Sequence, residues 1–266
     1  MSALLSKWFQ TIKISWSNLL AYRLNFFLLI IGPAFVFFFV KYNLWYSIFQ
    51  GDKTILVGGY TLEQMIHYQF FTLITALIAQ SSNGMKLSSD IRLGRISVFL
   101  IYPFNFWQYH CAHFLAFQSI QVIVGLLSIS IFYYLGLIYN LSMTSCIYGF
   151  SFCIIVGVLW FSIQYLIGLM AFWLEETWIL RVSFLTISNF LSGAIIPLEL
   201  YPKWLVNGLW YTPFPYLTFV PVKVFQGQFD MVNTAFFVIV FWTFVFACIS
   251  YFTWRKGLRL YTGAGM

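Results

Sequence analysis

Long apolar runs recur along the whole chain and restrict the folds it can adopt. Residues 30–40, reading IIGPAFVFFFV, carry no charge and do not alternate between polar and apolar. A helical run of about 20 such residues can cross about 30 Å of hydrocarbon. The chain is 61% hydrophobic and only 8% charged, which is too apolar for a soluble domain. A closed β-barrel would need short alternating segments, so we predict an all-α polytopic membrane protein.

The apolar runs predict about six transmembrane helices within one transmembrane domain that occupies residues 1–266. We expect residues 41–59 to form an external loop, and the pair Gly32-Pro33 to bend the first span. The predicted spans are residues 24–40, 61–81, 106–137, 143–173, 179–196 and 233–254.

The 14 basic residues favour one orientation in the membrane, because cytoplasmic loops are enriched in Lys and Arg. With both termini in the cytosol, most of them lie inside, which predicts a multi-pass plasma-membrane protein. The residues then inside are Lys7, Lys13, Arg23, Lys86, Arg92, Arg95, Arg181, Arg255, Lys256 and Arg259, and those outside are Lys41, Lys53, Lys203 and Lys223. Because the basic residues stand at segment ends rather than in one patch, we expect no nucleic-acid partner.

The N-terminal segment, residues 1–22, has the pattern of an amphipathic interface helix. Trp8 and Trp16 recur with other apolar residues at helical spacing, and Lys7 and Lys13 occupy the opposite face. Such a helix lies in the membrane interface rather than across it. It is either an anchor on the lipid surface or an element that also contacts a cytosolic partner.

A charged segment, residues 86–103 (KLSSDIRLGRISVFLIYP), separates the second and third predicted spans. We expect a cytosolic helix over residues 86–100 that docks on a partner protein. Its basic groups can form charge-assisted hydrogen bonds, its apolar residues can fill a groove, and its glycine allows close backbone approach. The alternative is a solvated loop without a partner. The candidate docking residues are Asp90, Ile91, Arg92, Leu93, Gly94, Arg95, Val98 and Phe99.

Residues 197–230 are apolar and aromatic but repeatedly interrupted by proline. Proline removes a backbone donor and clashes with the preceding helical turn. We therefore expect a re-entrant external helical hairpin between spans five and six rather than another full span. The residues expected to shape it are Gly193, Pro197, Pro202, Pro213 and Pro215.

Motifs for catalysis or nucleotide binding are missing from the sequence. It has no G-x-x-x-x-G-K-[ST] phosphate loop, no H-E-x-x-H and no G-x-S-x-G. His110 and His113 share a helix face without a nearby carboxylate, which favours structural histidines over a metal site. Glu63 and His67 form a possible pair near the outer interface. Because the spans hold few charges, ion-coupled transport is disfavoured, and uphill transport would need an external ATPase.

The order of these elements resembles the ABC-2 (type V) exporter permeases, specifically the small six-span group without an ATPase domain of its own. The resemblance covers nearly the whole chain. Its motifs are Ile91-Arg92-Leu93-Gly94-Arg95 followed by Leu100 and Pro103, then Ala171-Phe172-Trp173, then Ser192-Gly193-Ala194-Ile195-Ile196-Pro197-Leu198 followed by Tyr201-Pro202, then Pro213-Phe214-Pro215, Pro221 and Gly227.

The resemblance implies an ATP-driven exporter built from two permeases, identical or paralogous, and two separate ATPase subunits. ATP and Mg²⁺ would bind the ATPases, so this chain needs no cofactor. In the family, the helix between spans two and three is the coupling helix, a role that maps here onto residues 86–100. We expect a lipid-like or amphipathic cargo, contact with membrane lipids and residence in a bacterial inner membrane.

Two other classes of function remain open from the sequence. An intramembrane lipid-modifying enzyme would need a polar catalytic cluster, for which Glu63 with His67, or His110 with His113, are the candidates. A membrane scaffold or sensor subunit could bind an ATPase without transporting anything.

Overall fold

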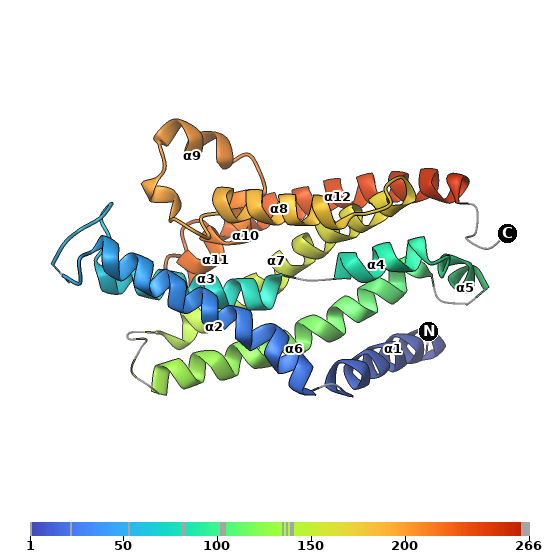
Figure 1. Cartoon of the computed structure of the whole chain (residues 1–266), viewed down its shortest axis with the longest axis horizontal. Coiled ribbons are helices and arrows are strands. Elements are labelled where there is room, and N and C mark those ends of the chain that lie inside the picture. Colours follow the sequence, from blue (N-terminus) through green and yellow to red (C-terminus); the bar gives the residue numbers. More distant parts are fainter. Residues whose placement is uncertain are drawn as a thin grey trace.

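The computed structural model describes residues 2–21, 23–52, 54–80, 83–101, 105–134, 136, 138 and 141–261, and this part of the chain is built from helices (Figure 1). The longer helices are α1 (Ser2–Ala21), α2 (Arg23–Ile48), α3 (Leu62–Ala79), α6 (Phe106–Tyr134), α7 (Met143–Leu169), α8 (Trp178–Leu191) and α12 (Val232–Leu260). The shorter ones are α4 (Asn83–Arg92), α5 (Ile96–Ile101), η1 (Met170–Phe172), η2 (Leu198–Leu200), α9 (Lys203–Leu209), α10 (Phe214–Leu217) and α11 (Phe219–Phe225).

The prediction of an all-α polytopic membrane protein is confirmed. By length and apolar composition, 3 helices among the described residues can cross a membrane: α6, the continuous helix formed by α7 with η1, and α12. They match the predicted spans three, four and six. The prediction of six spans further depends on α2, α3 and α8, which are described below.

Helix α2 extends further than the first predicted span. It continues through Gly32-Pro33 and past residue 40 to Ile48, so most of the expected loop at residues 41–59 is helical or tightly turned. The reason is packing: Trp45 and Phe49 are buried against Met65 of α3 and its neighbours. Helix α3 begins where expected, because Thr61 and Gln64 form a reciprocal capping box at its N-terminus.

Helix α7 forms the centre of the molecule. It packs against α12, α4, α11 and α3, and it contributes Phe152, Cys153, Val156, Leu159 and Trp160 to the largest cluster of buried side chains. A helix that is apolar on all sides belongs in the middle of a bundle. The spans thus provide a packed scaffold that positions both ends of the molecule.

Helix α8 is shorter than the fifth predicted span, residues 179–196. It ends at Leu191 after 14 residues, a length of about 21 Å that does not reach across the hydrocarbon layer alone. The chain turns there because Gly193 adopts φ +78°, and Ser192 donates a hydrogen bond from Oγ to Thr218 Oγ1 at 3.1 Å. The prediction of a helix up to residue 196 is therefore wrong.

Proline residues divide the segment after α8 into short helices, as the sequence indicates. Pro202 precedes α9, Pro213 precedes α10, and Pro215 lies in the first turn of α10. Pro197 precedes η2 in an extended conformation. The segment folds back so that α11 packs on α7 and α3.

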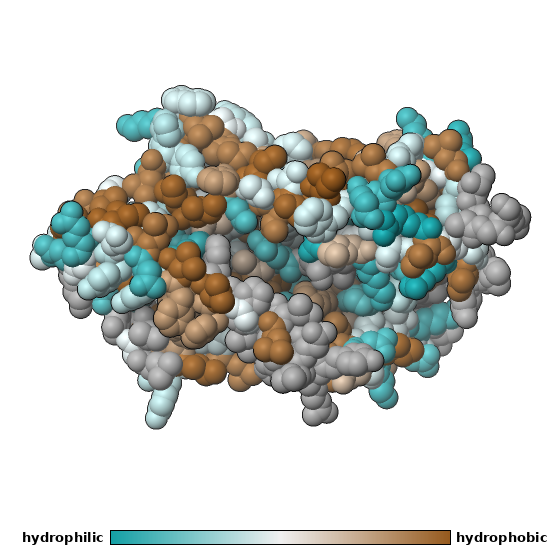
Figure 2. Space-filling view, viewed as in Figure 1, coloured by the Kyte–Doolittle hydropathy of each residue, from teal (hydrophilic) through white to brown (hydrophobic). Residues whose placement is uncertain are grey.

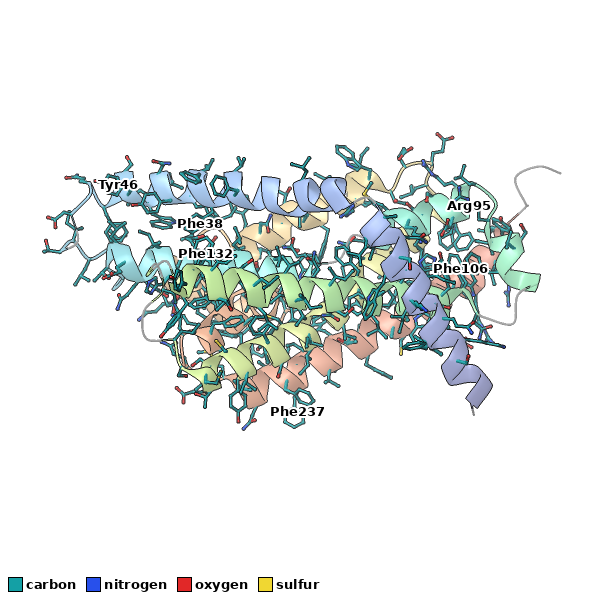
Figure 3. All side chains as sticks on the ribbon, turned by 90° about the horizontal axis from the view of Figure 1, so that it is seen from below. Phe38, Tyr46, Arg95, Phe106, Phe132 and Phe237 are labelled. Carbon is teal, nitrogen blue, oxygen red and sulfur yellow. The ribbon has the colours of Figure 1, made fainter. Side chains whose placement is uncertain are left out.

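The two ends of the long axis differ in content (Figure 1). Helices α4 and α5 lie at one end with α1 and the end of α12, whereas α9 to α11 and the turn after α2 lie at the other. Hydrophilic residues gather mainly toward these ends, with hydrophobic residues between them (Figure 2). Figure 3 places Arg95 and Phe106 at the α4–α5 end and Tyr46 at the opposite end.

Candidate functional site

The charged segment after α3 forms two helices rather than the single helix expected over residues 86–100. Helix α4 ends at Arg92, and α5 begins at Ile96. Between them Gly94 adopts φ +72°, and the backbone N–H of Arg95 donates to the carbonyl of Asp90 at 2.9 Å. An αL glycine with such a bond is a common way to end a helix. Gly94 therefore supplies the turn between the two helices.

The inner face of α4 and α5 anchors them to the spans. Leu87, Ile91 and Ile96 are buried in a cluster with residues of α6 and α7. Helix α4 also lies close to α7, where a Cβ on Gly84 would meet the carbonyl oxygen of Gln164 at 2.6 Å. Helix α4 is thus in direct contact with two spans, α6 and α7.

Asp90 also faces inward, although we predicted it as a docking residue. Its Oδ1 accepts a hydrogen bond from Arg95 at 3.3 Å, and its Oδ2 lies 3.8 Å from Nε2 of His110 in α6. Burial raises the pKa of this carboxyl above its usual value, while the charges of Lys86 and Arg95 partly offset the rise. Asp90 is better placed to connect α4 with α6 than to contact another protein.

Arg92 is also engaged within the chain. Its guanidinium forms an ion pair with Glu176 and donates to the backbone carbonyl of Glu175 at 2.7 Å. Both acidic residues belong to the turn between η1 and α8. The bridge ties α4 to the segment just before α8.

The residues left on the outer face are Leu93, Arg95 and Val98. Leu93 is 60% exposed and Val98 48% exposed, and the Arg95 side chain is also exposed. Phe99 is half-buried, with its ring packed on Phe106 and Tyr109. The predicted docking set therefore divides into an inner group that holds α4 and α5 in place and an outer group, which we call the docking patch (Leu93, Arg95, Val98).

We predict that charge reversal at Arg92 alone destabilises the chain, because Arg92→Glu sets two carboxylates against each other. The double variant Arg92→Glu with Glu176→Arg should restore the attraction. The side chains are 40% and 62% exposed, so the expected change is small, about 1 kcal/mol or less. The midpoint of thermal denaturation of the purified chain measures it. A double variant as unstable as the single one would contradict the bridge.

Helix α1 matches the predicted interface segment and packs against α6. The indole Nε1 of Trp16 donates to Ala116 O and to Ser119 Oγ, each at 3.0 Å. Trp8 lines an apolar groove of about 870 Å³ between α6, α7 and α12. Lys7 and Lys13 are exposed. Trp8 and Trp16 thus contact the spans, whereas Lys7 and Lys13 are exposed together with the apolar side chains of Phe9 and Ile14.

At the opposite end, the break after α8 is held by polar side chains from α2 and α3. Tyr68 donates its hydroxyl to Gly193 O at 2.6 Å, and Gln69 donates to Ile195 O at 3.2 Å. The buried Lys41 ammonium donates to Gln69 Oε1 at 2.5 Å and to Ala194 O. These bonds satisfy carbonyls that a continuous helix would have paired internally.

A second buried lysine, Lys223, fastens α11 to the start of α3. Its Nζ lies 2.6 Å from Glu199 Oε1 and donates to Tyr60 Oη at 2.7 Å. Burial, and after it the negative charge of Glu199, raises the pKa of the Tyr60 hydroxyl. From the sequence we expected Lys41 and Lys223 on the external side of the membrane, and we did not predict that they would be buried and hydrogen-bonded. Their positions within strongly apolar stretches are the signal that they need partners.

The remaining polar candidates do not assemble into one cluster. His110 is buried beside Asp90, whereas Glu63 and His67 lie in the first turns of α3. In the described part of the chain, no group of three or more His, Cys, Asp or Glu side chains is arranged to hold a metal ion.

The architecture has a match among known families. The model of a family described as ABC-2 family transporter protein matches residues 20–265, from the end of α1 to beyond α12. The chain belongs to the ABC-2 transporter family. A comparison with curated proteins finds no match. The resemblance noted from the motifs is thereby confirmed.

Membership of the ABC-2 family defines the general role of the chain. It is a membrane permease component of a transporter, and permeases of this family usually work with ATPase subunits. The apolar helices agree with a location in a membrane. Two parts of the molecule are candidates for a role in such a transporter: the docking patch, and the group of polar side chains around Lys223, namely Glu199 and Tyr60.

Proposed function

We propose that this chain is the membrane-spanning subunit of an ATP-driven exporter and that α4 and α5 dock on a separate ATPase. The observation that carries the proposal is the division of this segment into two faces. Its inner face is fixed to α6 and α7, and its outer face presents the docking patch. A rigidly held segment with exposed apolar and basic groups suits a surface that receives force from a partner.

The docking patch has the composition of a small interface. Leu93 and Val98 offer apolar area that a groove could bury, and Arg95 offers charge-assisted hydrogen bonds to an acidic rim. The sequence contains no phosphate loop, so ATP and Mg²⁺ would be held by the ATPase. Two ATPases and a second permease, identical or paralogous, would complete the complex.

Coupling would use the contacts already described. Closure of two ATPases around ATP would push α4, and its packing on α7 and the Asp90 contact to α6 would move these spans as rigid bodies. Helix α1, with Lys7 and Lys13 exposed, would lie on the same cytosolic side together with both termini. A bacterial inner membrane fits this arrangement.

A lipid-like or amphipathic cargo fits the composition of the membrane-spanning helices. The spans are rich in aromatic side chains and poor in charge, which suits an apolar chain better than a bare ion. The α9–α11 end would then face outward and border the exit from the translocation path.

The proposal is tested by isolating the chain from its native membrane in mild detergent and reconstituting the complex in vesicles. We expect an ATPase subunit to co-purify and ATP to drive export of an amphiphile. An ATPase that co-purifies without transport would favour the scaffold alternative. Chemical turnover of a lipid that is lost on alanine substitution of Glu63, His67, His110 and His113 would favour the enzyme alternative. Transport stimulated only by small ions would contradict the proposed cargo.

A further inference from the structure

The apolar groove of about 870 Å³ that Trp8 lines has the size of a ligand site, since pockets for organic molecules commonly measure about 300–1,000 Å³. Its walls come from α1, α5, α6, α7 and α12. Phe106, one of its lining residues, marks its position at the α4–α5 end in Figure 3. The three residues of the docking patch do not line it, and none of the roles described above uses it.

Aromatic side chains place this groove at the level of the membrane interface. Trp8, Trp107, Tyr251 and Trp254 all line it. Trp107 is 55% exposed and Tyr251 51% exposed, so the groove reaches the surface of the molecule. Trp and Tyr are enriched where lipid headgroups meet the acyl chains. A molecule bound here could bury an apolar chain in the groove and keep a polar head in the interface.

Helix α12 brings a positive charge to the edge of the groove. Arg255 follows Tyr251 by one helical turn, and its guanidinium carbon stands 4.8 Å from the centroid of the Tyr251 ring. This cation–π contact holds the charge against a side chain of the groove wall. Among the described residues, no carboxylate forms an ion pair with Arg255. The edge of the groove therefore favours an anion.

Ser250 adds a polar group inside the groove. It lines the groove and is only 6% exposed, and within the described part of the chain its Oγ has no hydrogen-bond partner. A buried hydroxyl without a partner is unfavourable, so a ligand with an acceptor oxygen at this point would be stabilised. Ser250 precedes Arg255 by about 7.5 Å of rise along α12.

These features together describe one class of ligand. It needs an anionic group for Arg255, an acceptor oxygen a short distance away for Ser250, and a long apolar chain for the groove. A glycerophospholipid has these parts in this order: a phosphate, ester carbonyls beyond the glycerol, and acyl chains. An apolar helix of another protein would offer Ser250 no free acceptor, because its backbone carbonyls are paired internally.

We propose that the groove binds one anionic glycerophospholipid, with its headgroup at Arg255, an ester carbonyl at Ser250 and an acyl chain between α7 and α12. The groove also touches Ile96 and Phe99 of α5 and Trp8 of α1. The bound lipid would therefore hold both of these surface helices against the spans. The inference goes beyond the proposed function, because it requires neither an ATPase nor a transported cargo.

Titration of the full chain with two lipids in a non-ionic detergent tests the headgroup contact. Dioleoyl phosphatidylglycerol and dioleoyl phosphatidylcholine share their acyl chains, and native mass spectrometry counts the bound molecules. We expect the anionic lipid to bind about fivefold more tightly, and Arg255→Gln to remove about that factor. Lys256→Gln removes the neighbouring exposed charge on another side of α12, and this matched control should keep the preference.

Two further variants test the groove itself. Ala247→Trp places an indole in the groove and should weaken both lipids about tenfold, whereas Ile249→Trp, at an exposed position outside it, should not. Ser250→Ala should weaken both lipids about threefold, since both carry the ester. The denaturation midpoint of each variant reports its folding. If Ala247→Trp lowers the midpoint, the Arg255 and Lys256 variants decide the question.

Equal affinity for the two lipids, or a preference that survives Arg255→Gln, would overturn the proposal. A preference lost equally in Lys256→Gln would assign it to general surface charge and would also overturn it. A folded Ala247→Trp variant with unchanged lipid affinity would exclude the groove as the site. The assay contains no ATPase and no transport step, so its outcome is independent of the proposed function.

Discussion

Replacement of both Leu93 and Val98 by aspartate is expected to abolish co-purification of the ATPase while leaving the chain folded. Both side chains are exposed and belong to the docking patch, so the substitutions remove no core contact. In an interface, however, each would bury an unpaired carboxylate in place of an apolar group. Residues at the centre of an interface commonly contribute about 2 kcal/mol or more, which corresponds to about thirtyfold weaker binding.

The matched control for this variant is Leu56→Asp. Leu56 is 65% exposed and lies at the opposite end of the molecule, in the turn between α2 and α3. The Leu56→Asp variant should bind the ATPase as tightly as the unmodified chain does. Unchanged co-purification by the Leu93→Asp, Val98→Asp double variant, with an unchanged denaturation midpoint, would exclude the docking patch. A double variant that fails to fold would show that these side chains act within the chain.

Gly84→Ala is expected to destabilise the chain, although it adds only one methyl group. Its Cβ would lie 2.6 Å from the backbone oxygen of Gln164, and a backbone atom inside the hydrogen-bonded helix α7 cannot move aside as a side chain can. Overpacking of this kind costs about 1–3 kcal/mol. The gain in helix propensity from glycine to alanine, about 1 kcal/mol, offsets only part of it. We expect a lower denaturation midpoint and weaker coupling of ATP hydrolysis to transport.

The variant Gly208→Ala serves as a control that separates the steric clash from the change in helix propensity. Gly208 lies in α9, and a Cβ there would meet nothing within 4 Å. This variant should be as stable as the unmodified chain or slightly more stable. If both alanine variants behaved alike, the close approach of α4 to α7 would not matter for stability, and the proposed transmission of motion through this contact would lose its support.

The spans could be predicted from the sequence more accurately than the breaks between them. Hydropathy located α6, α7 and α12, because helices that long and apolar have few alternative environments. It misjudged α2 and α8. The extension of α2 depends on the burial of Trp45 and Phe49 against α3, and the end of α8 depends on Gly193 and its contacts with Tyr68. These are tertiary contacts between residues far apart in the chain, which no local pattern contains.

The candidate site shows the same limit at the level of single residues. The charged segment was recognised from composition, but charge alone does not indicate which side chains face a partner. Asp90 and Arg92 were assigned outward, and the structure pairs them with His110 and Glu176. Glu176 is 84 residues away from Arg92 in sequence. The docking patch became definable only after these internal partners were known.

Site-specific photo-cross-linking from position 93 tests the docking patch most directly. A photoactivatable amino acid would replace Leu93, and a second protein carrying it at position 56 would serve as the comparison. With the complex in its native membrane, we predict a cross-link from position 93 to the ATPase subunit and none from position 56. Cross-links from position 93 only to lipid, or an ATPase cross-link from position 56, would contradict docking through α4 and α5.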